Sequence, residues 1–327
     1  MKKLKLLSFI FFITIFSCEN KLIPEDMYYK NSVDKSNIIK VKELDSMSVM
    51  DIDSEGNIYF PERKDNLIKK ITPDGKVSIF AGTGKKGDKI GKKEEAEFDS
   101  PVYLKIDDNG TFYIVLRNEK DESKIRTIDK NGIVSELKLD KEIEDYIPFL
   151  IGNEKVLIGK DFFSKDFKSI LGKPDRYIGE QSTSLNKKND FLYFLYEIRA
   201  FTENAFILKE QDSNNNIKTL YSYNENKFTN ERKIENPENL IFTSPPTSIT
   251  FDNEGNMYIG HRFGEISKFS STKKYIKTYF TYEFTTELFQ NKDHNNISSM
   301  LIDNKRKILY YTKSFGRDTY IYKINID

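Results

Sequence analysis

The chain has few of the cysteines and histidines that disulfides and metal sites need. It contains one cysteine, Cys18, so it cannot form an internal disulfide. Its two histidines, His261 and His294, form no H-x-x-x-H pair. A hydrolytic zinc site usually has three protein ligands, so carboxylates would have to complete any zinc site in this chain. No nucleophile elbow supports a serine triad. The sequence therefore predicts no cofactor.

The chain also lacks an excess of charge of either sign. Lysine and arginine number 52 and aspartate and glutamate 51, which leaves a net charge of +1. Nucleic-acid binding depends on the release of counterions by many positive side chains, and this chain has no global surplus of them. We expect no nucleic-acid partner, and any charged partner must be recognised by a local patch.

The first residues predict export and lipid anchoring. Lysines precede an apolar stretch from Leu6 to Phe16, which is about half the ~20 residues that span a bilayer. Residues 1–17 are therefore expected to be a lipoprotein signal peptide, because the end of the stretch with Cys18 resembles a bacterial lipobox. Lipid on Cys18 would hold the chain on a membrane of the cell envelope, facing the periplasm or the exterior, with residues 18–36 as a polar tether. The alternative is an ordinary secretory peptide with an incidental cysteine.

Internal repetition sets the organisation of the rest of the chain. Three segments align without gaps, each with a strand ending in Asp, a turn ending in Gly and a second strand with Tyr. They are SVMDIDSEGNIYF (Ser48–Phe60), PVYLKIDDNGTFYIV (Pro101–Val115) and PTSITFDNEGNMYIG (Pro246–Gly260). A fourth copy, ISSMLIDNKRKILYY (Ile297–Tyr311), has Arg306 at the glycine position. Because Asp and Asn side chains cap such turns and Gly supplies a positive φ, each copy predicts a β-hairpin.

A second hairpin completes the repeating unit. LIKKITPDGKVSIFAG (Leu67–Gly82) matches KIRTIDKNGIVSELKL (Lys124–Leu139) as strand, turn and strand. One unit is then four short strands over about 45–50 residues, which is typical of a β-propeller blade. Two weaker hairpins fit between the second and third clear copies, FLIGNEKVLIGKDF (Phe149–Phe162) and SLNKKNDFLYFLYE (Ser184–Glu197). The count indicates six blades.

The chain ends support a closed ring. The last copy ends with a third strand, TYIYKINID (Thr319–Asp327), and lacks a fourth, whereas NIIKVKEL (Asn37–Leu44) is a strand with no other partner. Pairing this N-terminal strand into the last blade would remove an open edge. We therefore expect residues 37–327 to form an all-β, six-bladed propeller of four-stranded antiparallel blades, with seven blades left open. The absence of tryptophan excludes propellers with a Trp-Asp signature.

The segment from Ser48 to Leu139 closely resembles the NHL repeat, particularly its bacterial form. The resemblance rests on GNIYF, on NLIKKITPDGKVSIFAGTGKKGDKIG, and on an Ala-x-Phe element before Pro101. It extends less closely to Pro246–Phe280 and Ile297–Asp327. It implies a binding scaffold, although a minority of the family are enzymes. Related six-bladed propellers include calcium-dependent lactonases and a zinc-dependent amidating lyase.

Two ligand-binding patterns fail in their context. Gly82–Gly87 fits G-x-G-x-x-G, but a dinucleotide loop opens a helix and Gly91 interrupts the sequence here. Asp51–Glu62 matches the ligand spacing of an EF-hand loop, but its flanks are strands, and its first position becomes Lys105 and Thr250 in the aligned copies. We interpret the first pattern as an exposed loop between blades and the second as a hairpin turn.

One set of side chains repeats where a ligand could bind. Arg63, Arg117 and Arg262 each follow the repeat tyrosine by four residues. In the fourth copy, Lys313 follows Tyr310 by three. They fall on the face that carries the connections between blades. The lysine-rich loop, which runs from Gly82 to Pro101, is on the same face, and its candidate ligand-binding residues are Lys85, Lys86 and Lys89. The planar guanidinium group suits carboxylate, sulfate or phosphate. Alternatively, the arginines pair with the loop acids Glu62, Glu119 and Glu265.

These patterns favour a non-catalytic binding module over an enzyme. The expected partner is a protein, a peptide or an anionic glycan on the loop face, with the membrane reached through the lipid. The alternative is a metal-dependent lactonase or lyase with its site in the central channel. Calcium there would need Asp, Asn or Glu at the mouths of several inner strands. The matched positions are Ser48, Pro101, Pro246 and Ile297, with Asp99 and Asn296 close by. A structural subunit of an envelope complex is a third interpretation. The sequence does not name the ligand, the membrane or the oligomeric state.

Overall fold

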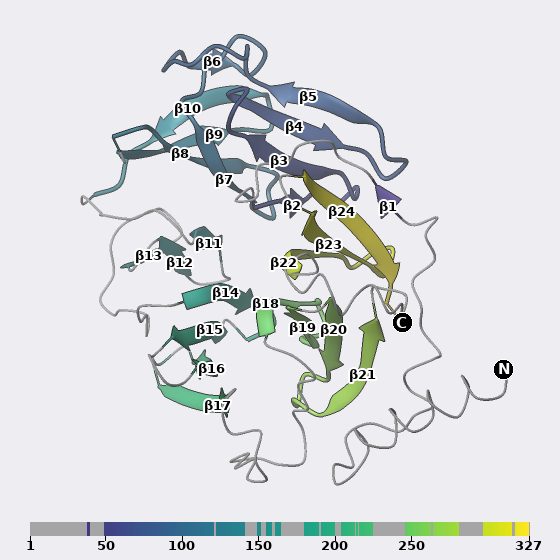
Figure 1. Ribbon diagram of the computed structural model, residues 1–327. Helices are drawn as coiled ribbons and strands as arrows, with labels where there is room; N and C mark the ends of the chain where they lie inside the picture. Colours follow the sequence, from purple (N-terminus) through teal and green to yellow (C-terminus); the bar gives the residue numbers. More distant parts are fainter. Residues whose placement is uncertain are drawn as a thin grey trace, which may run out of the picture. The chain divides into compact units, whose positions relative to one another are not determined.

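The strands of the computed structural model form six antiparallel sheets (Figure 1). The first is β2 (Asp51–Ile52), β3 (Ile58–Glu62), β4 (Leu67–Ile71) and β5 (Val77–Ala81). The second is β7 (Pro101–Ile106), β8 (Phe112–Arg117), β9 (Ser123–Ile128) and β10 (Ile133–Leu137), with β6 (Gly91–Lys92) on its outer edge. The third is β11 (Phe149–Ile151), β12 (Lys155–Ile158) and β13 (Asp161–Ser164).

The other three sheets have four strands each. The fourth is β14 (Glu180–Asn186), β15 (Phe191–Arg199), β16 (Asn204–Gln211) and β17 (Ile217–Asn224). The fifth is β18 (Pro246–Phe251), β19 (Met257–His261), β20 (Glu265–Phe269) and β21 (Tyr275–Phe280). The last is β22 (Ile297–Asp303), β23 (Ile308–Phe315) and β24 (Asp318–Asn325), with β1 (Ile38–Ile39) on its edge.

The structure describes residues 38–39, 49–120, 122–140, 149–151, 155–158, 161–164, 180–189, 191–199, 204–212, 214, 216–224, 246–262, 264–280, 297–315 and 318–326. Cys18, the expected signal peptide and the expected tether lie outside these residues, as does His294. No helix long and apolar enough to cross a membrane occurs among the described residues.

The sheets follow one another around a ring. Contacts between inner strands run from β2 to β7, β11, β14, β18 and β22, and β22 contacts β2 again. All the strand pairings within the sheets are antiparallel, so the fold is an all-β propeller. The expected pairing is present: β1 pairs with β24, with Ile38 opposite Tyr322 and Ile39 opposite Ile321. The prediction that the N-terminal strand completes the last sheet is therefore confirmed.

The expectation of four strands in every blade is wrong, because the sheets have three to five. The fifth strand of the second sheet comes from the lysine-rich loop, where Gly91 and Lys92 pair with Val134 and Ile133 of β10. The third sheet has three strands among the described residues, and the segment after β13, residues 165–179, lies outside them. The loop after β5 is therefore not the simple exposed connection that its glycines and lysines predict.

Aspartates hold the turns between the first and second strands, as the repeat predicts. The Asp53 carboxylate accepts hydrogen bonds from the backbone N–H groups of Glu55 and Asn57, both at 2.9 Å, and from the Tyr59 hydroxyl at 3.0 Å. Burial, followed by the Asp53 charge, raises the pKa of Tyr59. Gly56 takes a φ of 85° in this turn, a conformation that costs other residues about 1–2 kcal/mol. These contacts explain Asp53 and Gly56 without a calcium ion.

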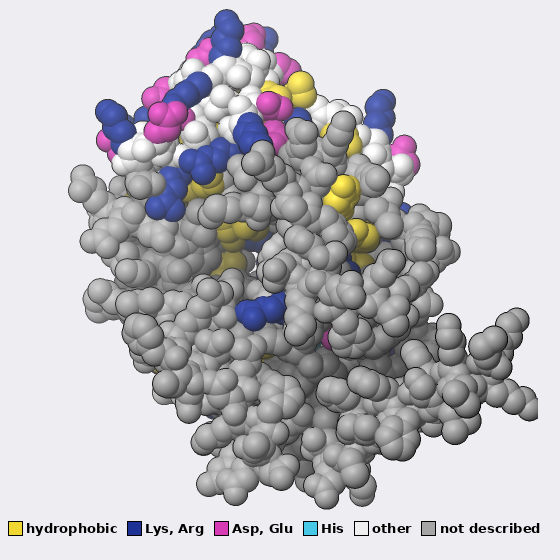
Figure 2. Space-filling model, in the orientation of Figure 1, with side chains coloured by type: hydrophobic (Ala, Val, Ile, Leu, Met, Phe, Trp, Pro, Cys, Tyr) yellow, Lys and Arg dark blue, Asp and Glu magenta, His cyan; other side chains and the backbone are white. Residues whose placement is uncertain are grey.

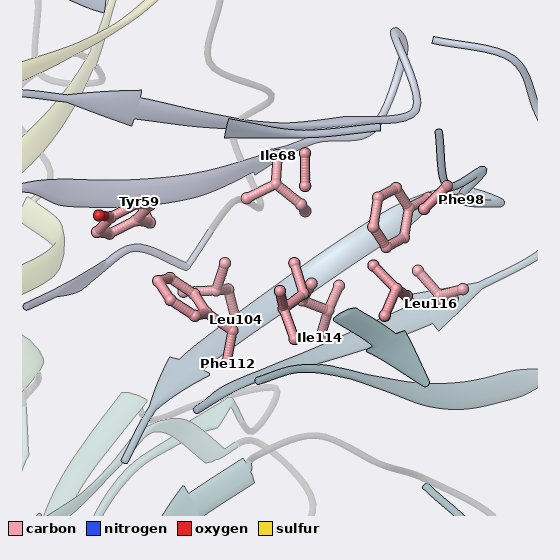
Figure 3. Close-up of a cluster of buried hydrophobic side chains, with 11 residues drawn as sticks. Tyr59, Ile68, Phe98, Leu104, Phe112, Ile114 and Leu116 are labelled. Atoms are coloured by element: carbon pink, nitrogen blue, oxygen red, sulfur yellow. The ribbon is translucent and has the colours of Figure 1, made fainter. Parts of the chain in front are cut away.

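The sheets pack through the faces of their strands. Between the first and second sheets, Tyr59 lies edge-on to Phe80 and Phe112, with ring centroids 4.8 Å apart in both pairs. Figure 3 shows the cluster of apolar side chains around this contact, with Phe98 of the lysine-rich loop at one end. Phe98 is fully buried. Burying a side chain of this size stabilises a fold by about 1.5–3 kcal/mol, so the loop is fastened by its own aromatic anchor.

The fourth copy has a turn one residue longer than the first. Ile52 pairs with Ile58 across the first turn, whereas Asp303 itself pairs with Ile308 in the last sheet. The left-handed conformation then falls on Lys307, with a φ of 54°, and not on Arg306 at the glycine position of the alignment. Arg306 instead turns its guanidinium to Asp303 at 2.7 Å and lies over Gly56 of the first sheet.

We expect Gly56→Ala to destabilise the ring more than Gly110→Ala, which changes the equivalent turn of the second sheet. Both positions have positive φ and lose similar free energy through backbone strain. A β-carbon at Gly110 meets open space, whereas one at Gly56 would lie 2.7 Å from Asp303 Oδ2 and would displace Arg306. Urea denaturation should show a further loss of about 1–2 kcal/mol for Gly56→Ala.

Adding Arg306→Ala to Gly56→Ala should remove part of this additional loss, because the crowded guanidinium is then absent while Asp303 Oδ2 remains close to the new β-carbon. Equal losses for the two single alanine variants would contradict a close contact between the first and last sheets at these turns.

Candidate functional site

A cavity of about 980 Å³ lies where the inner strands of the ring converge. Residues of β2, β7, β11, β14, β18 and β22 line it, together with the turns that follow most of these strands. Its walls combine aliphatic side chains with hydroxyls and charged groups. The volume is within the range of about 300–1,000 Å³ that is typical of small-molecule pockets.

An ion pair lies at one repeat position of this cavity. Asp51 of β2 and Lys105 of β7 are equivalent residues in neighbouring sheets, and their side chains are 14% and 21% exposed. Lys105 Nζ lies 3.7 Å from Asp51 Oδ2, and the same oxygen accepts a hydrogen bond from the Ile106 backbone N–H at 2.9 Å. Burial lowers the pKa of Lys105, but the interactions with Asp51 and Tyr103 together outweigh it and raise that pKa above its ordinary value. The ammonium therefore stays protonated in the cavity.

Most aspartates at the turn end of the cavity have structural partners. Asp107 and Asp252 repeat the Asp53 arrangement, each accepting two backbone N–H groups and a tyrosine hydroxyl. Burial, followed by the Asp107 carboxylate, raises the pKa of Tyr113 to about 12. These carboxylates hold turns, so the EF-hand-like spacing of the sequence reflects hairpin chemistry.

The three predicted arginines lie at equivalent positions, at the end of the second strand of their sheets. Arg63 follows the last residue of β3, Arg117 is the last residue of β8, and Arg262 follows the last residue of β19. All three side chains are half-buried. They occupy the strand ends opposite the aspartate turns, next to the start of the inner strands.

Lys313 does not join them. The longer turn of the last sheet shifts β23 by one residue, so that Lys313 pairs with the first residue of its inner strand, Ile297. His261 and Leu116 pair with Pro246 and Pro101 in the same way. Lys313 is thus equivalent to residues that precede the arginines, and a shift of one residue turns a side chain to the other face of a strand. It is 2% exposed, and burial lowers its pKa to about 7, opposed by Glu265.

Two of the three acids that were the alternative partners of the arginines lie close to lysines. Glu62 lies 3.2 Å from Lys69 Nζ, and Glu119 lies 3.1 Å from Lys86 Nζ. Glu265 is buried at the start of β20. Among the described residues, no ion pair joins Arg63 to a carboxylate.

The loop lysines are interspersed with acids. Lys86 also lies 3.5 Å from Asp99, and Lys89 lies 3.4 Å from Glu95. The hydrogen bond with Glu119 is the largest contribution that raises the pKa of Lys86. Lys85 is exposed. Figure 2 shows positive and negative side chains side by side over the region of β5, β6 and β10. Exposed ion pairs of this kind contribute about 0–1 kcal/mol each to stability, so replacing them by contacts with a partner costs little free energy.

A buried arginine fastens the loop, and the sequence patterns missed it. Arg126 of β9 is 2% exposed, and its guanidinium bonds the backbone oxygen and the carboxylate of Asp88 at 3.2 and 3.1 Å. Glu136 of β10 lies 3.3 Å from the same guanidinium, and Lys124 lies 3.0 Å from Asp88. The lysines of the loop are thus presented on a fixed backbone.

His261, the histidine of the sequence that the structure describes, is not placed as a metal ligand. It is fully buried, and its Nε2 lies 3.0 Å from Ser267 Oγ. The described residues contain no group of three histidine, cysteine, aspartate or glutamate side chains arranged to hold a metal ion.

We expect Asp88→Asn to loosen the lysine-rich loop, because it weakens the bonds to Arg126 and Lys124 together. Limited digestion with trypsin should cut at the lysines between residues 85 and 93 several-fold faster than in the unchanged chain. Glu94→Gln is the matched control, since Glu94 belongs to the same loop but pairs with its neighbour Lys93 at 3.0 Å. Equal cutting rates for the two variants would show that Arg126 does not hold the loop.

No family model matches the chain. One curated protein, SUPPRESSOR OF QUENCHING 1 of Arabidopsis thaliana, is 39% identical over 79 residues, which are 24% of this chain. The chain spans only about 7% of the length of that protein.

Several solved structures are similar over most of their length. A virginiamycin B lyase from Staphylococcus aureus covers 88% of this chain and 88% of its own, with 15% identity and a TM-score of 0.48. Regucalcin from Agrobacterium tumefaciens covers 88% and 95%, with 11% identity and a TM-score of 0.48. A gluconolactonase from Xanthomonas campestris covers 83% and 70%, with 10% identity and a TM-score of 0.33. At these identities the likeness is one of fold alone.

Proposed function

We propose that the chain is an exported, lipid-anchored β-propeller of NHL type, whose six sheets act as blades of one ring and which binds its partner without catalysis. The partner is a protein, a peptide or an anionic glycan, and it binds the face that carries Arg63, Arg117 and Arg262. The observation that carries the proposal is the repetition of a half-buried arginine at the same strand end in three sheets.

The chemistry of this face suits a partner with several anionic groups. Each guanidinium presents a planar set of donors that matches a carboxylate or a sulfate. The acids next to two of these arginines, Glu62 and Glu119, are engaged by lysines. The lysine-rich loop lies beside Arg117, because Lys86 reaches Glu119 in the turn after β8. Lys85 and Lys89 extend the positive surface along this loop.

Binding is favoured over catalysis by the use that the fold makes of its acidic groups. The aspartates at the ends of β2, β7 and β18 accept turn N–H groups and tyrosine hydroxyls. Carboxylates held in this way cap turns and are poorly placed to transfer protons to a substrate. The proposed surface needs only positive charge on a rigid backbone, which the ring supplies.

We expect the combined variant Arg63→Gln, Arg117→Gln, Arg262→Gln to bind a sulfated glycan such as heparin at least about tenfold more weakly at ~0.15 M salt. A variant that removes the same charge elsewhere, Lys130→Gln, Lys218→Gln, Lys274→Gln, should bind almost as well as the unchanged chain, because these exposed lysines lie in or next to the outer hairpins. Isothermal titration calorimetry measures both affinities. Equal losses in the two variants would reduce the binding to a non-specific charge effect.

The alternative function is a metal-dependent lactonase or lyase acting in the cavity. The observation that supports this function is the cavity of about 980 Å³ at the centre of the ring. The similar structures include a lyase and a gluconolactonase. Stoichiometric calcium or zinc in the purified chain would favour the enzyme over the binding module.

The proposed anchor is tested at Cys18. We expect Cys18→Ser to move the chain from the membrane fraction to the aqueous fraction, because the thiol is the proposed site of lipid attachment. Fractionation followed by immunoblotting measures the change, and Ser17→Ala serves as the neighbouring control. A Cys18→Ser chain that stays in the membrane fraction would remove lipidation from the proposal.

A further inference from the structure

The cavity contains an ammonium group with few close polar contacts. Lys105 is about four-fifths buried, and the ion pair that it forms with Asp51 has a separation of 3.7 Å between Nζ and Oδ2. That separation is longer than a hydrogen bond. A protonated lysine has three N–H donors, and leaving them unsatisfied in a buried place is costly. The Lys105 donors therefore call for oxygen acceptors from within the cavity.

Asp51 keeps acceptor sites free beside these donors. Its Oδ1 accepts the Ile52 backbone N–H at 3.0 Å, and its Oδ2 accepts the Ile106 N–H at 2.9 Å. A carboxylate has about four acceptor positions, so half of them remain. The pair thus offers donors and acceptors side by side. A vicinal diol uses both at once, because one hydroxyl can donate to Asp51 while the other accepts from Lys105.

The positions equivalent to Asp51 and Lys105 in the fifth and last sheets carry no charge. Where the first two sheets place Asp51 and Lys105, the fifth places Thr250 and the last places Leu301. Serines 184 and 299 add hydroxyls from β14 and β22, and Tyr103 adds an aromatic ring from β7. The lining is thus a mixture of polar and aliphatic groups, and its hydroxyls and charged groups can orient a ligand by hydrogen bonds.

Charge selects among the ligands that fit. Seven carboxylates and three lysines line the cavity, and this negative surplus disfavours an anion. The ammonium of Lys105 disfavours a cation at the pair itself. A neutral ligand avoids both penalties and still supplies hydroxyl oxygens.

We propose that the cavity is a second binding site, in which the Asp51–Lys105 pair recognises a vicinal diol of a neutral saccharide. The site is separate from the arginine face and does not depend on it. The volume of about 980 Å³ accommodates one to a few sugar rings.

Titration of the purified full chain with four sugars tests the proposal, in a detergent that has no sugar headgroup. Glucose and maltose are neutral, glucuronate is the matched anion and glucosamine the matched cation. We expect saturable binding of a neutral sugar, with glucuronate and glucosamine both weaker than glucose. Absence of saturable binding for both neutral sugars would overturn the proposal, and tighter binding of either charged sugar would overturn the assignment to a neutral ligand.

Variants identify the site. Lys105→Met should weaken binding of the neutral sugar at least about tenfold, since hydrogen bonds to a charged group are lost. Lys130→Met, which changes an exposed lysine in the turn between β9 and β10, should leave the affinity unchanged. Ser299→Phe fills the cavity from β22 and should abolish binding, so it decides the question if Lys105→Met fails to fold. Unchanged affinity in a folded Lys105→Met or Ser299→Phe chain would overturn the proposal.

The combined variant Arg63→Gln, Arg117→Gln, Arg262→Gln should bind the neutral sugar with unchanged affinity. This result separates a test of the cavity from a test of the arginine face.

Discussion

The rest of the structure depends on the hydrogen bonds that the aspartate after each inner strand accepts from the following turn. In the first sheet, one carboxylate holds two backbone N–H groups of the turn and the hydroxyl of Tyr59 on the next strand. The same arrangement recurs at Asp107 and Asp252. It sets where the second strand starts and which of its side chains face the neighbouring sheet. The positions of the arginines at the far ends of these strands follow from that register.

The two ends of the ring consequently have different chemistry. At the strand ends opposite the turns, arginines and the lysine-rich loop provide positive charge on a backbone that Arg126 and Phe98 hold in place. Inside the ring, the aspartates of the turns belong to the scaffold, and the residues that vary between copies carry the recognition chemistry. Asp51 and Lys105 are the clearest example, because equivalent positions in adjacent sheets carry opposite charges. A repeated fold thus becomes a specific site where its copies differ.

The sequence was sufficient to predict what local chemistry determines. Asp53 and Gly56 act within a few residues of themselves, and the pairing of the chain ends follows from a strand without a partner. The position of Lys313 was mispredicted, because the additional residue in the preceding turn shows in the sequence only as a spacing of seven residues, not six, from the repeat aspartate to the repeat tyrosine. Arg126 was missed for a different reason. Its burial depends on a loop that folds back from residue 88, and this contact leaves no periodic pattern in the sequence.

The pairing of β1 with β24 also governs when the fold can be completed. Ile38 and Tyr322 are far apart in the sequence, and among the strand pairings of the described residues theirs has the largest sequence separation. Each hairpin can form as soon as its own residues are available, but the last sheet lacks its edge strand until residue 322 has been synthesised. The edge of the last sheet can therefore be closed only after residues from both halves of the chain are present together.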